Sequence, residues 1–307
     1  MLTFKHLEAL YWVVELGGFA PAAARLHTTQ SAVSKRVLDL EEHFETPLFD
    51  RTLRRARPTD KGAEMHAIAK DLLERRDTAI ERFTRPEAVE RRLRIGVTEV
   101  AAMTWLPALL SRISDQYPRV SVEAEADAMI PLRDKLLAGD RDLIVVPAEL
   151  DDARLAREVV GEVTMAWMCQ PSLLEKKTLS LDALMQQTFL EEGQRSGSGR
   201  LLNRWLKTMG QQPSRTILSS NLVTVVSMTV AGLGVSRLPQ DCMRPLVEAG
   251  LLQVLKVKPV APNVTYVVSY KKEVASTFLT SIVRLAKECC DFTRLFQTGT
   301  KDLRRRS

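Results

Sequence analysis

Histidine is scarce in this chain of 307 residues and missing from most of it. The four histidines all lie at the N-terminal end: His6, His27, His43 and His66. The rest of the chain therefore has no side chain for a histidine-based catalytic triad or a histidine metal site. A phosphate-cradling glycine loop is missing as well, since Gly232-Leu233-Gly234 alone is a weak signal.

Cysteine and long apolar runs are also sparse. The four cysteines, Cys169, Cys242, Cys289 and Cys290, show neither metal-ligand spacing nor a disulfide framework, so we expect reduced and partly buried thiols. A redox switch that pairs Cys169 with Cys242 is the alternative. No apolar run approaches the ~20 residues that span a bilayer, and residues 1–6 lead into an amphipathic helix without a signal-peptide core. We therefore expect a cytoplasmic protein with no membrane partner.

What the chain does contain is typical of a soluble protein with more than one domain. Hydrophobic residues make up 45% and charged residues 27% of its 307 residues, a length that favours two or three domains. The net charge of +6 is unevenly placed, because residues 51–61 hold five basic side chains against one acid. Such a cluster favours contact with phosphate. Residues 301–306 are also basic, and we interpret them as a solvated tail.

The strongest pattern lies between residues 19 and 49. Apolar residues at helical spacing predict one buried stripe on a helix that runs to about Glu45: Val33, Val37, Leu40 and Phe44. Thr29 is the expected N-cap of this helix. The opposite face carries short or flexible hydrogen-bonding side chains at its N-terminal end: Gln30, Ser31, Ser34 and Lys35.

A shorter helix precedes this one. It is expected over residues 21–26, with Pro21 in its first turn and Ala20 where a capping Ser or Thr is usual, and His27-Thr28 form the connection. Two helices joined by a tight turn, the second polar at its front and apolar at its back, form a helix-turn-helix. In that motif the second helix enters the major groove, and its first residues meet base edges.

Two further features follow the helix-turn-helix. Residues 51–58 are rich in arginine, and we interpret them as a short β-ribbon, or wing, that meets phosphates; a solvated basic loop is the alternative. Thr59 then caps a helix that continues to about Phe83 with a narrow apolar stripe. A helix of this kind needs a partner and is expected to mediate dimerisation. Arg85-Pro86 interrupts the pattern and indicates a hinge.

From Arg92 onward the pattern is that of an α/β protein. Strands and helices alternate, which predicts a parallel sheet with right-handed crossovers. The first run contains strands at 93–97, 120–125 and 143–146 and helices at 103–116 and 130–138. The second run, from 163 to 255, contains helices at 198–209 and 222–231 and a strand at 234–238, before a late strand at 264–269 and a final helix at 277–292.

Five sequence strings, in order and at fitting distances, resemble the LysR-type transcriptional regulators over essentially the whole chain. They are Ala23-Ala24-x-Leu26; Thr29-Gln30-Ser31-Ala32-Val33-Ser34-x-x-Val37-x-x-Leu40-Glu41; Pro47-Leu48-Phe49-x-Arg51 with Pro58-Thr59-x-x-Gly62; Leu137-x-x-Gly139-x-x-Asp142-Leu143; and Ala231-Gly232-Leu233-Gly234-Val235-x-x-Leu238-Pro239. Two positions depart from the family pattern. Ala20 occupies the helix cap, and Arg237 stands where an apolar residue is commoner.

The resemblance implies a winged helix-turn-helix on a linker helix, followed by a two-lobed α/β effector domain like a periplasmic solute-binding protein. The implied divisions are 1–58 for the DNA-binding domain, 59–90 for the linker helix and hinge, 91–162 plus 266–295 for lobe I, 163–265 for lobe II, and 296–307 for the tail. It further implies dimers, usually paired into tetramers, on inverted-repeat double-stranded DNA near promoters. RNA polymerase is a further candidate partner. A small-molecule effector between the lobes would control DNA binding or bending, and no cofactor or enzymatic activity is expected.

Site residues follow from the resemblance together with the chemistry of each side chain. The expected DNA contacts are Gln30, Ser31, Ser34 and Lys35 to bases and Arg36, Arg51, Arg54 and Arg55 to phosphates. The expected effector contacts come from strand ends and helix starts of both lobes: Thr98, Glu99, Val100, Pro147, Ser196, Ser198, Ser220 and Asn221. Residues 98–102 are expected to be a loop.

The class of effector stays open at this point. Ser196 to Ser198 precede a helix and could hold a carboxylate, with Arg195 or Arg200 nearby, or could serve only as an N-cap. Glu99 is unexpected at an anion site and could instead select an amine-bearing or hydroxylated ligand, so an anionic metabolite is only weakly preferred. Two other functions use the same α/β half, a transport solute-binding protein and an enzyme. The helix-turn-helix argues against the first, and the lack of histidine and of a phosphate loop argues against the second.

Overall fold

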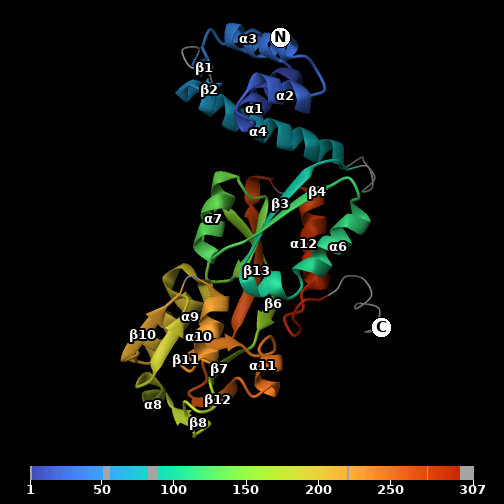
Figure 1. The fold of residues 1–307 in the computed structure, drawn as a ribbon. Helices are drawn as coiled ribbons and strands as arrows, with labels where there is room; N and C mark the ends of the chain where they lie inside the picture. The colour runs from blue at the N-terminus through green and yellow to red at the C-terminus, as the bar shows by residue number, and fades with distance from the viewer. Residues whose placement is uncertain (1, 51–55, 82–88, 220, 275, 298–307) are drawn as a thin grey trace. The chain divides into compact units, whose positions relative to one another are not determined.

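The computed structural model describes residues 2–50, 56–81, 89–219, 221–274 and 276–297. It divides the chain into two units, Met1–Thr84 and Arg85–Ser307, which are described separately below (Figure 1). Among the described residues, no helix combines the length and the apolar character needed to cross a membrane.

The N-terminal unit is a winged helix-turn-helix followed by a long helix. Its elements are α1 (Phe4–Glu15), α2 (Phe19–Arg25), α3 (Gln30–His43), β1 (Phe49–Asp50), β2 (Arg57–Pro58) and α4 (Asp60–Glu81). Leu10 of α1, Val33 of α3 and Ala69 of α4 meet in one core with no exposed surface. The predicted ribbon is confirmed, because β1 and β2 pair antiparallel. Residues 51–55, which connect them, lie outside the described residues.

Two predicted helix ends in this unit are wrong. α3 ends at His43, and Phe44 is its C-cap, 42% exposed, so the buried stripe comprises only Val33, Val37 and Leu40. The chain turns away here because Glu45 adopts a φ of 49°. α2 begins at Phe19 with Gly18 as N-cap, so Ala20 lies inside the helix and is not its cap.

The start of α4 is fastened to the chain that precedes the wing. The Thr59 hydroxyl accepts from the Gly62 amide at 3.0 Å and donates to the Pro47 carbonyl at 2.9 Å, which confirms the predicted cap. Gly62 is needed because a Cβ there would lie 1.9 Å from the Leu48 carbonyl oxygen. The predicted hinge at residues 85–86 falls outside the described part of the chain.

The first sheet of the C-terminal unit has the strand order β4-β3-β5-β13-β6. Its strands are β3 (Arg92–Val97), β4 (Ser121–Ala126), β5 (Leu143–Pro147), β6 (Leu155–Val163) and β13 (Val264–Lys271). β3 pairs parallel with β4 and β5, whereas β13 runs antiparallel to both β5 and β6. The predicted parallel pairing is confirmed for β3, β4 and β5, but the antiparallel pairs of β13 with β5 and β6 make the sheet mixed. β13 returns from the far end of the chain and inserts in the opposite direction.

Helices cover both faces of this sheet (Figure 1). The covering helices are α5 (Glu99–Met103), α6 (Leu106–Gln116) and α12 (Thr277–Cys289) on one face and α7 (Met129–Ala138) on the other. Successive side chains of a strand point to opposite faces. In β5, Leu143 and Val145 accordingly pack with α6 and α12, while Ile144 and Val146 pack with α7. This explains why β5 appears in the sequence as a continuous apolar run.

The predicted loop at residues 98–102 is in fact helix α5, and the helix predicted to begin at Met103 begins at Leu106. The break lies at Thr104, whose φ and ψ of −105° and −90° are not helical. Pro107 has no N–H to donate to the carbonyl of Met103, four residues earlier. That carbonyl instead accepts from the Phe296 amide at 2.7 Å.

The second sheet has the strand order β10-β9-β11-β7-β12-β8. Its elements are β7 (Met165–Cys169), β8 (Thr178–Ser180), α8 (Leu181–Met185), β9 (Thr188–Glu191), η2 (Gly193–Arg195), α9 (Gly197–Thr208), β10 (Arg215–Leu218), α10 (Leu222–Val230), β11 (Val235–Pro239), α11 (Arg244–Glu248) and β12 (Gln253–Lys258). Trp167 and Cys169 face α8 and α9, whereas Ala166 and Met168 face α10. This sheet is also mixed, since β7 is antiparallel to β11 and β12. A short helix, η3 (Lys272–Val274), follows β13.

The first two residues of the segment assigned to the tail, 296–297, are hydrogen-bonded to the C-terminal unit, whereas the basic residues 301–306 that we interpret as solvated lie outside the described residues. Gln297 is 7% exposed, and its side chain donates to the carbonyls of Asp291 at 2.6 Å and Arg294 at 3.2 Å. Its backbone amide reaches the Thr104 carbonyl at 3.4 Å. Residues 298–307 lie outside the described residues. The four cysteines are free, and burial raises the pKa of each of them, so none is poised as a thiolate.

Candidate functional site

The front of α3 presents polar side chains to solvent. Gln30, Ser31, Ser34 and Lys35 are exposed and Arg36 is partly buried. The back of the same helix is held in the core by Val33, Val37 and Leu40, which are at most 3% exposed. Thr29 caps the helix by accepting from the Ala32 amide at 3.2 Å, as predicted. The helix therefore displays its first turns as a rigid polar edge.

Glu41 connects α3 to the wing. It is 8% exposed, and one carboxylate oxygen accepts from the amides of Leu48 at 2.7 Å and Phe49 at 3.1 Å. This role was missed at the level of sequence, although an acid beside Val37 and Leu40 on the apolar side of the helix is a signal for it. Arg51, Arg54 and Arg55, the predicted phosphate contacts, lie outside the residues that the structure describes.

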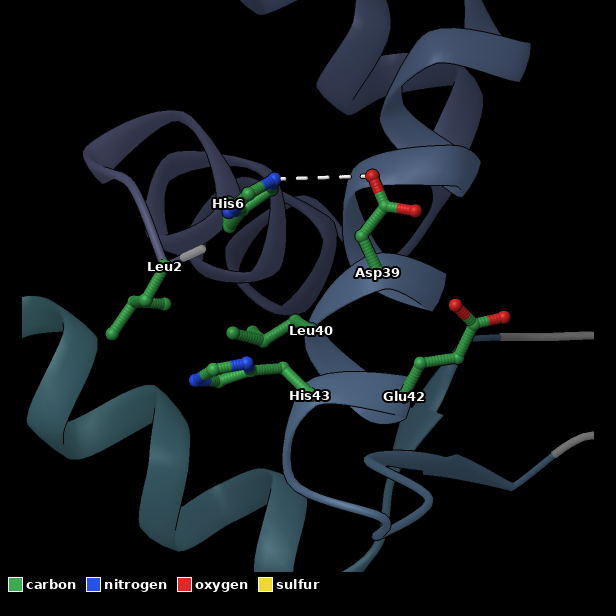
Figure 2. A pocket seen from close by; sticks show the side chains of 6 residues that line it. All are labelled: Leu2, His6, Asp39, Leu40, Glu42 and His43. Atoms are coloured by element: carbon green, nitrogen blue, oxygen red, sulfur yellow. Dashed lines mark ion pairs between the residues drawn. The ribbon is translucent and has the colours of Figure 1, made fainter.

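A hollow of about 380 Å³ lies beside the C-terminal half of α3 (Figure 2). It is lined by Leu2, His6, Asp39, Leu40, Glu42 and His43. Figure 2 shows the ion pair of His6 and Asp39 in its wall, with Nε2 and Oδ2 3.9 Å apart. No group of three potential metal ligands is assembled anywhere in the described ranges. This hollow lies about one turn or more beyond Lys35 and includes none of the predicted site residues.

A cavity of about 260 Å³ lies between the strand ends of the two sheets. It is lined by Thr98, Glu99, Val100, Ala126, Asp127, Ala128, Met129, Pro147, Glu192, Arg195, Ser196, Ser198, Asn221, Leu222 and Tyr266. Every predicted effector residue that the structure describes is among them. Ser220 falls outside the described part. The location fits the rule that ligands of α/β sheets bind beyond the carboxyl ends of the strands.

A partly buried carboxylate, that of Glu192, lies beside the N-terminus of α9. Glu192 accepts from the hydroxyls of Ser196 at 3.1 Å and Ser198 at 3.2 Å, and those two hydroxyls lie 2.8 Å apart. Burial raises the pKa of Glu192, and the nearby charge of Glu99 adds to the rise; the two serine hydrogen bonds oppose it. Ser196 is also the N-cap, with its hydroxyl 3.5 Å from the Gly199 amide.

The N-terminus of α10 is contacted by a carboxylate of α5, a helix that packs on the first sheet. Glu99, on α5, accepts from the Leu222 amide at 2.5 Å, while Asn221 caps α10 by accepting from the Thr224 amide at 2.8 Å. Glu99 therefore bridges the two lobes. Gly197 is a second point of close approach, because a Cβ there would lie 2.6 Å from the Cβ of Pro147.

Two further polar groups complete the cavity wall. Asp127 is 3.0 Å from Lys135; burial acts to raise its pKa, but hydrogen bonds from Lys135 and the Ala128 amide hold that pKa below its usual value. The Tyr266 hydroxyl accepts from Thr98 at 3.1 Å, and complete burial raises its pKa. Tyr266 therefore stays neutral at physiological pH.

Sequence reasoning missed Asp127, Glu192 and Tyr266. A usable signal exists for the two acids, because Asp127 follows β4 and Glu192 follows β9 directly, at the strand ends where ligands of such sheets bind. Tyr266 gives no such signal. It lies within β13, and only the pairing of β13 with β5 brings it opposite Pro147.

Comparison with known proteins agrees with this architecture in both units. A model of the LysR substrate binding domain matches residues 86–290. A model of the bacterial regulatory helix-turn-helix proteins of the lysR family matches residues 4–63. The first of these alone covers more than half of the chain.

Individual relatives are distant but extend along most of the chain. The HTH-type transcriptional regulator CzcR of Bacillus anthracis is 26% identical over 249 residues, which are 81% of this chain and 84% of that protein. The HTH-type transcriptional regulator MetR of Escherichia coli is 25% identical over 254 residues, which are 82% of this chain and 79% of that protein.

Solved structures show the same fold. A full-length OxyR of Pseudomonas aeruginosa superposes with a TM-score of 0.71 at 20% identity, covering 95% of this chain and 96% of that one. ArgP of Mycobacterium tuberculosis superposes with a TM-score of 0.67 at 21% identity, covering 94% of this chain and 97% of that one. The chain therefore belongs to the LysR-type transcriptional regulators, with a helix-turn-helix DNA-binding domain and an effector-binding domain.

Proposed function

We propose that the exposed front of α3 reads the DNA sequence in the major groove. Gln30 suits adenine, Lys35 suits guanine, and Ser31 and Ser34 suit either a base or a phosphate. Arg36, which lies one step around the helix, contacts phosphate together with Arg51, Arg54 and Arg55. The observation that supports this proposal is the exposure of Ser34 and Lys35 on a helix whose back is fully anchored.

A gel-shift titration with DNA that flanks the protein's own gene tests this assignment. We expect binding at moderate ionic strength that unrelated DNA of equal length does not match. Each phosphate contact adds about 0.9 to the slope of log affinity against log salt concentration. Failure to bind any promoter fragment under these conditions would contradict the proposal.

The cavity between the two sheets is the proposed effector site. We assign residues 91–162 plus 266–295 to lobe I and 163–265 to lobe II, so that a ligand in the cavity contacts both lobes and biases their arrangement. The supporting observation is that residues 98, 147, 196 and 221, far apart in sequence, line one enclosure. A molecule held there would control DNA binding or bending by the DNA-binding unit.

Ser198→Ala tests this part of the proposal. The variant should lose most of the thermal stabilisation that an effector gives, because Ser198 lines the cavity, while its affinity for promoter DNA should stay unchanged. Ser227→Ala is the matched control, since Ser227 is exposed on α10 and does not line the cavity. A loss of DNA binding in Ser198→Ala would argue against its role at the effector site.

Self-association is proposed through α4. Ala69 and Leu73 face the core of the N-terminal unit, but Ile68, Leu72 and Ile80 are 46%, 37% and 55% exposed, which leaves an apolar face available to a second copy. We propose dimers on inverted-repeat DNA that pair into tetramers, with RNA polymerase as a further partner in the cytoplasm and without enzymatic activity. Light scattering of Leu72→Glu, which should shift the protein toward monomers, tests the interface.

A further inference from the structure

Two carboxylates at the cavity lack a positively charged partner. Among the described residues, neither Glu99 nor Glu192 forms an ion pair with Lys or Arg. Asp127 differs, because Lys135 lies 3.0 Å from it and Arg195 adds a favourable charge. The negative charge of Glu99 and Glu192 is therefore not neutralised within the described protein.

The starts of α5, α7, α9 and α10 all line the cavity, and at two of them, α9 and α10, an acid of the protein already lies close by. Helix N-termini attract anions through their free N–H groups and the helix dipole. At α10 this place is taken by Glu99, which accepts from the Leu222 amide, and beside α9 the two serine hydroxyls donate to Glu192. An incoming carboxylate or phosphate would meet like charge at both positions, whereas a cation would meet opposite charge at both.

An independent observation comes from a small recess of about 30 Å³ that shares Glu192, Ser198 and Leu222 with the cavity. Arg237 lines it and is 9% exposed, with its Nη1 lacking a hydrogen-bond partner in the described chain. Its other terminal nitrogen donates to the Pro262 carbonyl. Burial lowers the pKa of Arg237 to about 10, so the guanidinium remains charged at neutral pH. Glu191 lines the same recess; it hydrogen-bonds to Asn203, but its buried Oε2 has no hydrogen-bond partner in the described chain, and burial raises its pKa.

We propose that the effector is a small zwitterion of the amino-acid class. Its ammonium group lies between Glu99 and Glu192, and its carboxylate reaches the free Nη1 of Arg237. This inference rests on the proposed function, in which the cavity is the effector site. The size is consistent, since about 260 Å³ lies slightly below the ~300–1,000 Å³ of sites for drug-sized ligands.

Binding of such a ligand depends on pH with a defined sign. The ammonium requires ionised Glu192, whose raised pKa lets it hold a proton as the pH falls. The charged or titratable groups around Glu192 are Glu99 of α5, Asp127 before α7, Glu191 of β9, Arg195 of η2, Arg237 of β11 and Tyr266 of β13. Affinity should therefore rise as the pH rises through the pKa of Glu192, with release of a proton on binding. A carboxylate ligand without an amine would show the opposite trend.

A matched series of five-carbon probes tests the proposal on the full-length protein. L-norvaline carries both groups, pentylamine only the amine, and pentanoate only the carboxylate. Thermal stabilisation and calorimetry at millimolar probe should rank norvaline first and pentanoate last. Glu192→Gln should weaken norvaline binding roughly 30-fold, the loss that corresponds to removing one partner of a buried charge pair. Arg237→Met should weaken norvaline but leave pentylamine unchanged, and Glu175→Gln, an exposed acid of the same lobe, should change neither.

The possible outcomes distinguish a wrong ligand class from a wrong location of the effector site. The zwitterion assignment would be overturned if pentanoate stabilises the protein while norvaline and pentylamine do not, or if no probe stabilises it. Unchanged norvaline binding in Arg237→Met would show that the recess holds only water and would overturn the carboxylate contact. If norvaline stabilises Glu192→Gln and Glu99→Gln as strongly as the parent, the ligand binds elsewhere and the cavity itself is not the effector site. Retained promoter binding by both variants confirms that they are folded.

Discussion

The front of α3 and the cavity between the sheets are both polar surfaces, but they are built in opposite ways. Gln30, Ser34 and Lys35 lie within six consecutive positions of one helix and make no side-chain hydrogen bond to another described residue. The cavity collects groups from residues 98 to 266, and Glu99 and Glu192 already bind backbone or hydroxyl donors. The first surface is ready for an external partner. The second has to exchange internal contacts for ligand contacts, so its ligand can change the structure.

The largest expected effect is that of Gly62→Ala, which should destabilise the unit that carries α3 without affecting the unit that contains the cavity. In Gly62→Ala the new Cβ would lie 1.9 Å from a backbone oxygen, which cannot move aside as a side chain can. The overpacking should cost roughly 3 kcal/mol in the free energy of unfolding of the N-terminal unit. Thermal unfolding should show an early transition with loss of promoter binding and an unchanged transition for the C-terminal unit. Gly18→Ala, whose Cβ would meet only the Pro21 ring at 3.4 Å, should lose no more than about 1 kcal/mol, the cost of Ala at the N-cap of α2; equal stability of both variants would contradict this.

Gly197→Ala tests the cavity side of the comparison. Its Cβ would lie 2.6 Å from the Pro147 Cβ and 2.9 Å from the Met129 sulfur. The added methyl group should therefore push the segments that carry Gly197 and Pro147 apart. We expect a loss of about 2 kcal/mol in the stability of the C-terminal unit and a weakened effector response, with promoter affinity retained. Unfolding monitored by tryptophan fluorescence, with and without effector, measures both. Lys207→Ala, exposed on the same helix, is the control and should change neither.

Lys35→Ala tests the open polar edge. Loss of one base contact should cost about 1–3 kcal/mol of discrimination, or roughly tenfold weaker binding to the promoter site, with little change in protein stability. Fluorescence anisotropy at fixed salt, on promoter and random DNA, gives the two affinities. An equal loss on both DNAs would show that Lys35 contacts phosphate and not a base.

The smallest effect is a pH dependence of the ligand-free protein. The pKa of Glu192 is raised in the folded state above its ordinary value of 4.5, so the folded protein binds this proton more tightly than the unfolded chain does. The stability that this group contributes is therefore lost as the pH rises from that value through the raised pKa. Glu192→Gln stays neutral and should raise the melting midpoint at neutral pH but not in acid. A shift of equal size at every pH would contradict this account, and Glu175→Gln serves as the reference.

The difference between contiguous residues in α3 and distant residues at the cavity also explains which features could be predicted from the sequence. The recognition helix, its Thr29 cap and its buried Val33 and Val37 follow from local spacing, because one helical period determines both faces. The end of α3 could not be placed, since Phe44 fits the apolar period equally well and only the turn at Glu45 removes it from the core.

In the C-terminal unit the predicted effector residues that the structure describes do line one cavity, because strand ends gather at the same edge of a sheet. The antiparallel insertion of β13 and the helical state of residues 99–103 depend on distant partners. No local pattern shows that Tyr266 will face Thr98, or that the amide of Phe296 will meet the carbonyl of Met103. Long-range pairing of this kind limits what a single sequence can predict.

The docking of Phe296 and Gln297 has a consequence for the other end of α5. The carbonyls of Met103 and Thr104, which accept their amides, lie at the last residue and the C-cap of α5, four and five residues after Glu99. A chain that ends before Phe296 would lack these two hydrogen bonds at the C-terminal end of α5. Glu99, at the N-terminal end of the same helix, would then be positioned less firmly. Phe296 and Gln297 thus belong to the framework that positions Glu99 against α10, and allostery assays require a polypeptide that retains them.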